Sequence, residues 1–258
     1  AHFKQPTTDK SAADLKVLFD KAPDAESKAV ALWACAGGKK KEAGSWIVEL
    51  VRAGKLAEFP HSLAACVSDL RLVECRDEMA KAFFGATGES EKRFQLYSLL
   101  ELCTKADEKL VLRLFDKLDV EEARPVAEWF TTNASPAAIE RCHRLVGGKF
   151  EEHWHLTFAL AAMGDERVVE WAVELSKKAT ENKWMAYYTF AHSPRPEAET
   201  LIRGVIRQGT QEALISLVQG FDDSRIPKRL TFLREIARLP KKSPKLVYWL
   251  HRILEPIG

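Results

Sequence analysis

FALAAMGDERVVE, at residues 158–170, decides the fold class of this chain. Its first half is a run of small and apolar residues, which is typical of a buried helix. Gly164 marks the end of that helix, since glycine favours the position just past a helix C-terminus. Asp165 is a favourable N-cap for a following helix, which begins with charged residues and valines. The stretch therefore predicts two helices joined by a tight turn.

The same pattern recurs along the whole chain with a period of about 30 residues. Each copy is an apolar stretch, a turn or capping group, and a second amphipathic stretch. The copies align on Ala36, Val67, Thr104, Asn133, Met163, His192 and Phe221. One longer spacing contains the insertion GATGES, at residues 85–90. A regular period of this length predicts stacked helical hairpins.

Small residues occupy the position just before each of these anchors. They are Cys35, Cys66, Cys103, Thr132, Ala162, Ala191 and Gly220. Small side chains allow close approach, so we expect the two helices of a hairpin to touch here. Three of the five cysteines fall in this column, and the chain has no C-x-x-C pair. We therefore interpret the cysteines as reduced core residues and not as disulfide partners or metal ligands.

Residues 158–170 resemble the HEAT-like repeat of the phycobilisome-lyase type, and the other copies share its hydrophobic spacing without the Gly–Asp pair. The resemblance implies an all-α, armadillo-like fold: a right-handed α–α superhelix, or solenoid, of about seven hairpins with a capping helix at each end. The whole of 1–258 is then a single repeat domain. The expected hairpins are 26–55, 57–85, 91–119, 121–148, 151–179, 181–209 and 211–239, and the caps are 11–21 and 244–254.

Serine–proline pairs support several of the predicted helix starts. Ser135–Pro136, Ser193–Pro194 and Ser243–Pro244 each offer an N-cap serine followed by proline at the first helical position. No segment shows the strict alternation of a strand, so no sheet is expected.

Charge is nearly balanced over the chain but uneven along it. The formal net charge is +2, which excludes a basic field over the whole molecule. Between Arg225 and Arg252, however, nine Lys or Arg stand against one acid, Glu235. This asymmetry indicates an acidic partner near the C-terminal end. The alternative is a solvated polar face.

Basic residues also recur four positions after the anchors, at Lys40, Arg71, Arg167 and Arg225. In HEAT-like arrays the second helices line the concave face, so the resemblance implies a basic ridge there. Exposed aromatic residues beside basic ones suit a binding face as well, and Lys183–Trp184 is such a pair. The predicted partner-binding residues are Lys40, Arg71, Arg167, Arg225, Lys228, Arg229, Arg234, Arg238 and Trp184. The alternative is that these charges only solvate helix ends.

No catalytic, cofactor or metal motif stands out. GGKKK, at residues 37–41, lacks the remaining residues of a phosphate-binding loop, and neither G-x-S-x-G nor H-E-x-x-H occurs. Cys142, His143, His153 and His155 are close in sequence, but two histidines two apart lie on nearly opposite faces of a helix. We expect no cofactor and no metal, and these observations favour a protein without enzymatic activity.

Two functions follow from these observations. The first is a non-enzymatic scaffold or adaptor that binds a protein, for example an acidic segment, through the concave or basic C-terminal face within a larger assembly. The alternative is a nucleic-acid-binding solenoid, which binds RNA or is similar to the HEAT-like DNA glycosylases. No stretch reaches the roughly 20 apolar residues of a membrane span. We expect an intracellular location, cytoplasmic or in an organellar matrix, and a processed targeting peptide stays open.

Overall fold

The computed structural model of the chain describes residues 10–255. Within this range every regular element is a helix: there are 16 α-helices, short 3-10 segments and no strand. The all-α class predicted from the sequence is confirmed. None of the helices in this range combines the length and apolar character that crossing a membrane requires.

The chain forms two compact units, Ala1–Val111 and Leu112–Gly258, and the boundary falls inside α7 (Glu108–Phe115). The other α-helices of unit 1 are α1 (Ala12–Lys21), α2 (Ala25–Gly37), α3 (Gly44–Arg52), α4 (Ser62–Asp69), α5 (Arg76–Gly85) and α6 (Glu89–Leu102). Those of unit 2 are α8 (Arg124–Phe130), α9 (Pro136–Val146), α10 (Trp154–Ala162), α11 (Glu166–Lys177), α12 (Trp184–His192), α13 (Pro196–Gln208), α14 (Gln211–Asp223), α15 (Arg229–Ala237) and α16 (Pro244–Leu254). The 3-10 segments are Lys41–Ala43, Lys55–Ala57, Val73–Cys75, Lys105–Asp107 and Glu181–Lys183.

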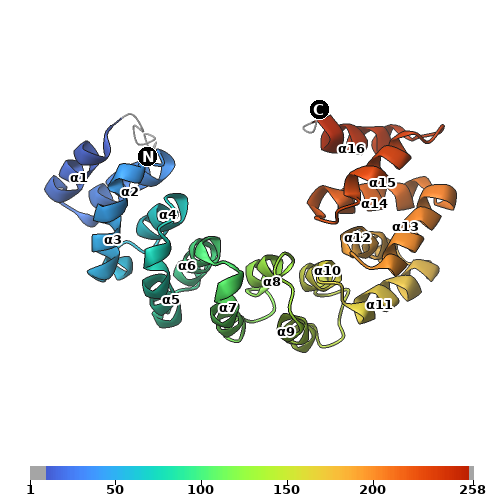
Figure 1. Ribbon diagram of the computed structural model, residues 1–258, viewed down its shortest axis with the longest axis horizontal. Coiled ribbons are helices and arrows are strands. Elements are labelled where there is room, and N and C mark those ends of the chain that lie inside the picture. The colour runs from blue at the N-terminus through green and yellow to red at the C-terminus, as the bar shows by residue number, and fades with distance from the viewer. Residues whose placement is uncertain (1–9, 256–258) are drawn as a thin grey trace. The chain divides into compact units, whose positions relative to one another are not determined.

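The helices of unit 2 follow one another in pairs, and we call the even-numbered members, α8 to α16, its first-helix row. Each member of the row packs on the next: α8 on α10, α10 on α12, α12 on α14, and α14 on α16. Figure 1 shows α10, α12 and α14 side by side, with α11 and α13 on the other side of the row. Unit 1 has the same relation between α2, α4 and α6. First helices therefore form a continuous row of contacts within each unit.

Small residues allow this contact. A Cβ added to Gly220 on α14 would lie 2.8 Å from the Cβ of Ala191 on α12. Between α2 and α4, the Cys66 thiol donates to the carbonyl of Leu32 at 3.1 Å. The small residues of this column thus lie where successive first helices touch, whereas the sequence predicted that they lie between the two helices of one hairpin. At Cys103, Thr132 and Ala162 the column is not fully buried.

Three turns between paired helices share one backbone geometry. Lys39, Arg71 and Gly164 have φ angles of 47°, 54° and 81°. In each case the next amide donates to a carbonyl five residues back, for example Asp165 to Leu160 at 3.0 Å. This is a common way to end a helix through one left-handed residue. Glycine adopts that conformation without strain, whereas Lys39 and Arg71 do so at a cost.

Two of the three serine–proline starts are confirmed. The hydroxyls of Ser135 and Ser243 accept from backbone amides at the starts of α9 and α16. The third is wrong, because α13 begins at Pro196. Ser193 is buried, and its hydroxyl accepts from the Arg195 amide at 3.3 Å. The helix therefore begins at Pro196 and not at Pro194.

Candidate functional site

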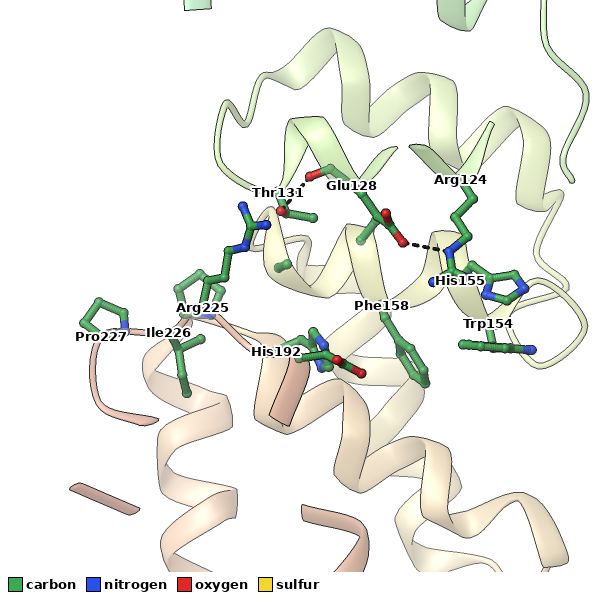
Figure 2. Close-up of a pocket in the computed structure, with 14 residues that line it drawn as sticks. Arg124, Glu128, Thr131, Trp154, His155, Phe158, His192, Arg225, Ile226 and Pro227 are labelled. Atoms are coloured by element: carbon green, nitrogen blue, oxygen red, sulfur yellow. Dashed lines mark hydrogen bonds and ion pairs between the residues drawn. The ribbon is translucent and has the colours of Figure 1, made fainter. Parts of the chain in front are cut away.

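A cavity of about 520 Å³ lies over the first-helix row of unit 2. Residues from four successive elements meet there: α8, α10, the end of α12, and the segment between α14 and α15 (Figure 2). The lining residues are Arg124, Glu128, Thr131, Trp154, His155, Phe158, Ala159, Ala162, His192, Pro194, Asp223, Arg225, Ile226 and Pro227. This volume is within the range of small-ligand and anchor-residue pockets.

One side of the cavity is lined by Trp154, Phe158 and His192. Trp184 and Tyr188 pack against Phe158 next to this lining, and we define the five residues together as the aromatic wall. The Phe158 ring stacks on Tyr188 at 5.2 Å and on His192 at 5.5 Å between centroids. Trp154 lies 5.6 Å from Phe158, and Trp184 lies 5.3 Å from Tyr188. Spacing of four residues along α10 and α12 puts these rings on one face of each helix.

The two tryptophans of the wall face solvent. Trp154 is 39% exposed and Trp184 is 38% exposed, whereas Phe158 is 8% exposed. Phe158 is therefore the buried support, and the indoles are the surface that a ligand would meet. Exposed aromatic residues over a cavity are typical of binding surfaces.

Two carboxylates add negative charge to the cavity. Glu128 on α8 accepts from the Nε of Arg124 at 2.7 Å, and Figure 2 shows this pair across the cavity from Phe158 and His192. Asp223, at the end of α14, is exposed and has no hydrogen bond or ion pair within residues 10–255. Asp223 lines the same cavity as His192 of the aromatic wall. Burial raises the pKa of Tyr188, and the Asp223 charge adds to that rise.

Burial favours the neutral form of both histidines of the cavity. Burial lowers the pKa of His192 below its ordinary value of 6.5, against the opposing effects of the Tyr188 carbonyl and the Asp223 carboxylate. The Nδ1 of His192 lies 2.9 Å from that carbonyl, so Nδ1–H donates and Nε2 is left as an acceptor. Burial also lowers the pKa of His155, and its Nδ1 is buried without a partner among the described residues.

Of the residues predicted for partner binding, one lines this cavity and a second lies next to it. Arg225 lines the cavity. Trp184 belongs to the aromatic wall, with its ring 6.3 Å from Phe158. Arg225 is exposed and has no partner within the described part of the chain.

Other predicted residues near the C-terminal end have structural partners. Lys228 pairs with Glu199 at 2.6 Å. Arg229 donates to the carbonyls of Ser224 at 3.0 Å and Asp222 at 3.4 Å, and so closes the end of α14. Arg234 and Arg238 lie exposed at the end of α15 and just beyond it.

The remaining three predicted residues occupy different turn positions. Arg71 takes the left-handed place that Lys39 takes in its own turn, so Lys40 is equivalent to Leu72. Arg167 is the second residue of α11, 4.0 Å from Glu140. Equal spacing from the sequence anchors therefore does not put these side chains at equivalent places.

Metal and thiol chemistry is not assembled in residues 10–255. No group of three or more His, Cys, Asp or Glu side chains converges there as a metal site would require. All five cysteines are free, and four of them are buried. Burial raises the pKa of Cys35 to about 11 and that of Cys142 to about 12, which keeps both thiols protonated. The interpretation of the buried cysteines as core residues is confirmed.

Sequence reasoning missed most of the cavity. The predicted site residues did not include Glu128, Trp154, Phe158, His192 and Asp223. The predicted basic ridge lay on second helices, whereas these residues lie on first helices. A usable signal existed: aromatic residues four apart at 154 and 158, and again at 184, 188 and 192, repeat on two neighbouring first helices. Comparison with known proteins yields no matching family model, no matching curated protein and no matching solved structure.

Proposed function

We propose that this chain is a HEAT-like α-helical solenoid that acts as a non-enzymatic scaffold and docks a segment of a partner protein in the cavity of unit 2. The observation that carries the proposal is the solvent-facing indole of Trp154 in a cavity lined by charges of both signs, with the exposed Trp184 next to it in the aromatic wall. Interface centres are enriched in tryptophan, tyrosine and arginine, and anchor residues of a partner fill pockets there.

The solenoid part of the proposal is supported within each unit separately. Paired helices follow one another in chain order, and each first helix packs on the next. Turns at Lys39, Arg71 and Gly164 repeat one geometry. Stacked repeats of this kind expose a large surface for their mass, which suits a scaffold.

A protein segment fits the cavity better than a phosphate backbone does. Aromatic rings with Arg124 and Arg225 would suit single-stranded nucleic acid, and this observation supports the alternative. Glu128 and Asp223 lie in the same cavity, however, and would repel phosphate. Lys228 and Arg229, which would have extended a basic surface, are engaged within the chain.

A titration separates the two functions. We expect no submicromolar binding when fluorescently labelled duplex DNA, single-stranded DNA and structured RNA are titrated with the full chain. Anisotropy would be measured from about 50 to 200 mM salt, the range over which phosphate contacts weaken steeply. Submicromolar affinity with a steep salt slope would contradict the scaffold and support a nucleic-acid function, of which a glycosylase-like enzyme is one form.

The positive test is selection of peptides from a random display library on the full chain. We expect selected peptides to bind at least about tenfold more weakly to Trp154→Ala, since truncating an anchor tryptophan typically costs 2 kcal/mol or more. Trp33→Ala is the matched control, because Trp33 is 40% exposed on α2 and does not line the cavity. Circular dichroism would check that both variants fold. Equal binding to the wild type and Trp154→Ala would reject this cavity as the docking site.

A further inference from the structure

The cavity holds hydrogen-bond acceptors that the protein itself leaves unused. Asp223 has no partner within the described residues, although Arg225 follows it by only two positions. His192 has its Nδ1 engaged by the Tyr188 carbonyl, so its Nε2 is also an open acceptor. Arg124, by contrast, already donates to Glu128. Asp223 and His192 are therefore the open acceptors of the cavity, and Arg225 is its open donor.

Aromatic faces add to the same preference. The face of an aromatic ring carries negative electrostatic potential, and cations bind over tryptophan more strongly than over other rings. Trp154 in the cavity and Trp184 next to it are both partly exposed to solvent. A flat cation fits both the open acceptors and the aromatic rings, because it can stack on a ring and donate to a carboxylate.

We infer that the cavity of unit 2 selects a partner segment that inserts an arginine side chain between the aromatic wall and Asp223. The inference rests on the proposed docking function. Guanidinium is planar, stacks on aromatic rings and donates in a fork to a carboxylate, which the compact ammonium of lysine does not do. A neutral His192 leaves the ring beside this position uncharged.

Arg225 has a complementary role in this arrangement. It is exposed, lies on the segment that follows Asp223, and makes no ion pair within the described residues. Its guanidinium would meet carbonyl or carboxylate groups of the partner on either side of the inserted arginine. An acidic anchor in the cavity would instead lie next to Asp223 and Glu128 and be repelled.

The test uses three capped peptides with the full chain: acetyl-Gly-Arg-Gly-amide, and the same peptide with Gln or Glu in the middle. Indole N–H resonances would be followed by NMR, with Trp154→Phe and Trp184→Phe identifying two of them. We expect the arginine peptide to shift both resonances with millimolar affinity, and the Gln and Glu peptides to bind at least about fivefold more weakly, as a lost charge-assisted hydrogen bond implies. A preference for the Glu peptide, or equal binding of all three, would overturn the inference.

Variants of the carboxylate sharpen this test. Asp223→Asn should weaken the arginine peptide about fivefold or more, and Asp223→Lys should abolish its binding. Glu170→Gln is the matched control, because Glu170 is an exposed carboxylate of α11 that does not line the cavity. Unchanged affinity in both Asp223 variants would overturn the inference.

The two proposals fail in different ways. Display peptides that need Trp154 but show no enrichment in arginine, and that bind Asp223→Asn as well as the wild type, would reject the arginine anchor and leave the scaffold standing. Display peptides that ignore Trp154 would reject the docking site itself.

Discussion

His192 shows at the level of one residue how the cavity and the core share a side chain. Its ring stacks on Phe158 and Tyr188, at 5.5 and 6.1 Å between centroids, and its Nδ1–H donates a hydrogen bond to the Tyr188 carbonyl. The same ring lines the cavity. Charging it would cost desolvation energy in the core and would add a positive charge where a cation is expected to bind.

Protonation of His192 gives a pH dependence of stability. Its pKa in the folded protein lies below the ordinary 6.5, chiefly because of burial. Between these two values the unfolded chain binds more protons than the folded one, so the free energy of unfolding falls as the pH falls below about 6.5. His192→Gln should remove this part of the slope, measured by urea denaturation from pH 7.5 to pH 5. An unchanged slope in the variant would show that other groups cause it.

The N-cap of α16 gives a second prediction for a single side chain. The hydroxyl of Ser243 accepts from the Leu246 amide at 3.3 Å. Replacing an N-cap serine with alanine typically costs about 1 kcal/mol. Ser243→Ala should therefore lower the free energy of unfolding by about 1 kcal/mol. Ser216→Ala is a suitable control, since its hydroxyl only donates back to the Glu212 carbonyl within α14, and it should have a smaller effect.

At the level of elements, the contact between first helices is what positions the site. Trp154 and Phe158 come from α10, whereas Trp184, Tyr188 and His192 come from α12. Close packing of α12 on α14, through Ala191 and Gly220, brings Asp223 to the same place. The cavity therefore depends on the distance between neighbouring helices of the row.

Gly220→Ala tests this dependence. The new Cβ would lie 2.8 Å from the Ala191 Cβ and 3.1 Å from the Tyr188 Cα, so α12 or α14 must move. Overpacking of this kind costs typically 1–3 kcal/mol, which exceeds the gain of up to about 1 kcal/mol in helix propensity. We expect net destabilisation of about 1–2 kcal/mol in thermal or urea unfolding.

Gly204→Ala is the matched control for that substitution. Gly204 is an exposed interior residue of α13 with no heavy atom within 4 Å of an added Cβ. It should gain about 0.5–1 kcal/mol from helix propensity alone. Stabilisation by both substitutions would contradict the close contact between α12 and α14.

At the level of the whole molecule, most of the cysteine thiols in the described range are buried among the helices. Four of the five cysteines are buried, and burial also raises the pKa of the fifth, Cys103, to about 12. A thiolate is the reactive form, so the raised pKa slows the reaction of Cys103, and burial shields the other four thiols from the reagent. The folded protein should react slowly with a thiol reagent at pH 8, and all five should react in denaturant. Fast labelling of several thiols in the folded protein would contradict the core assignment.

Much of the helical order could be predicted from the sequence, because it depends on local signals. Gly164–Asp165 ends one helix and caps the next, and Ser135 and Ser243 begin α9 and α16 as predicted. The start of α13 could not be predicted, since Ser193 is drawn into the core by its neighbours. Positions in two of the turns could not be predicted either, because Lys39 and Arg71 take a conformation that sequence alone assigns to glycine.

By itself, therefore, the sequence determined the all-α class, the N-caps at Ser135, Asp165 and Ser243, and the interpretation of four buried cysteines as core residues. Only the tertiary structure decided that first helices pack on one another and that Trp154, His192, Asp223 and Arg225 surround one cavity. The physical reason is that exposure of an aromatic residue is not a local property. Trp154 and Phe158 lie four residues apart on the same face of α10, yet Trp154 faces solvent and Phe158 is buried. The difference arises because Tyr188 and His192 of α12, about 30 residues later in the sequence, stack on Phe158.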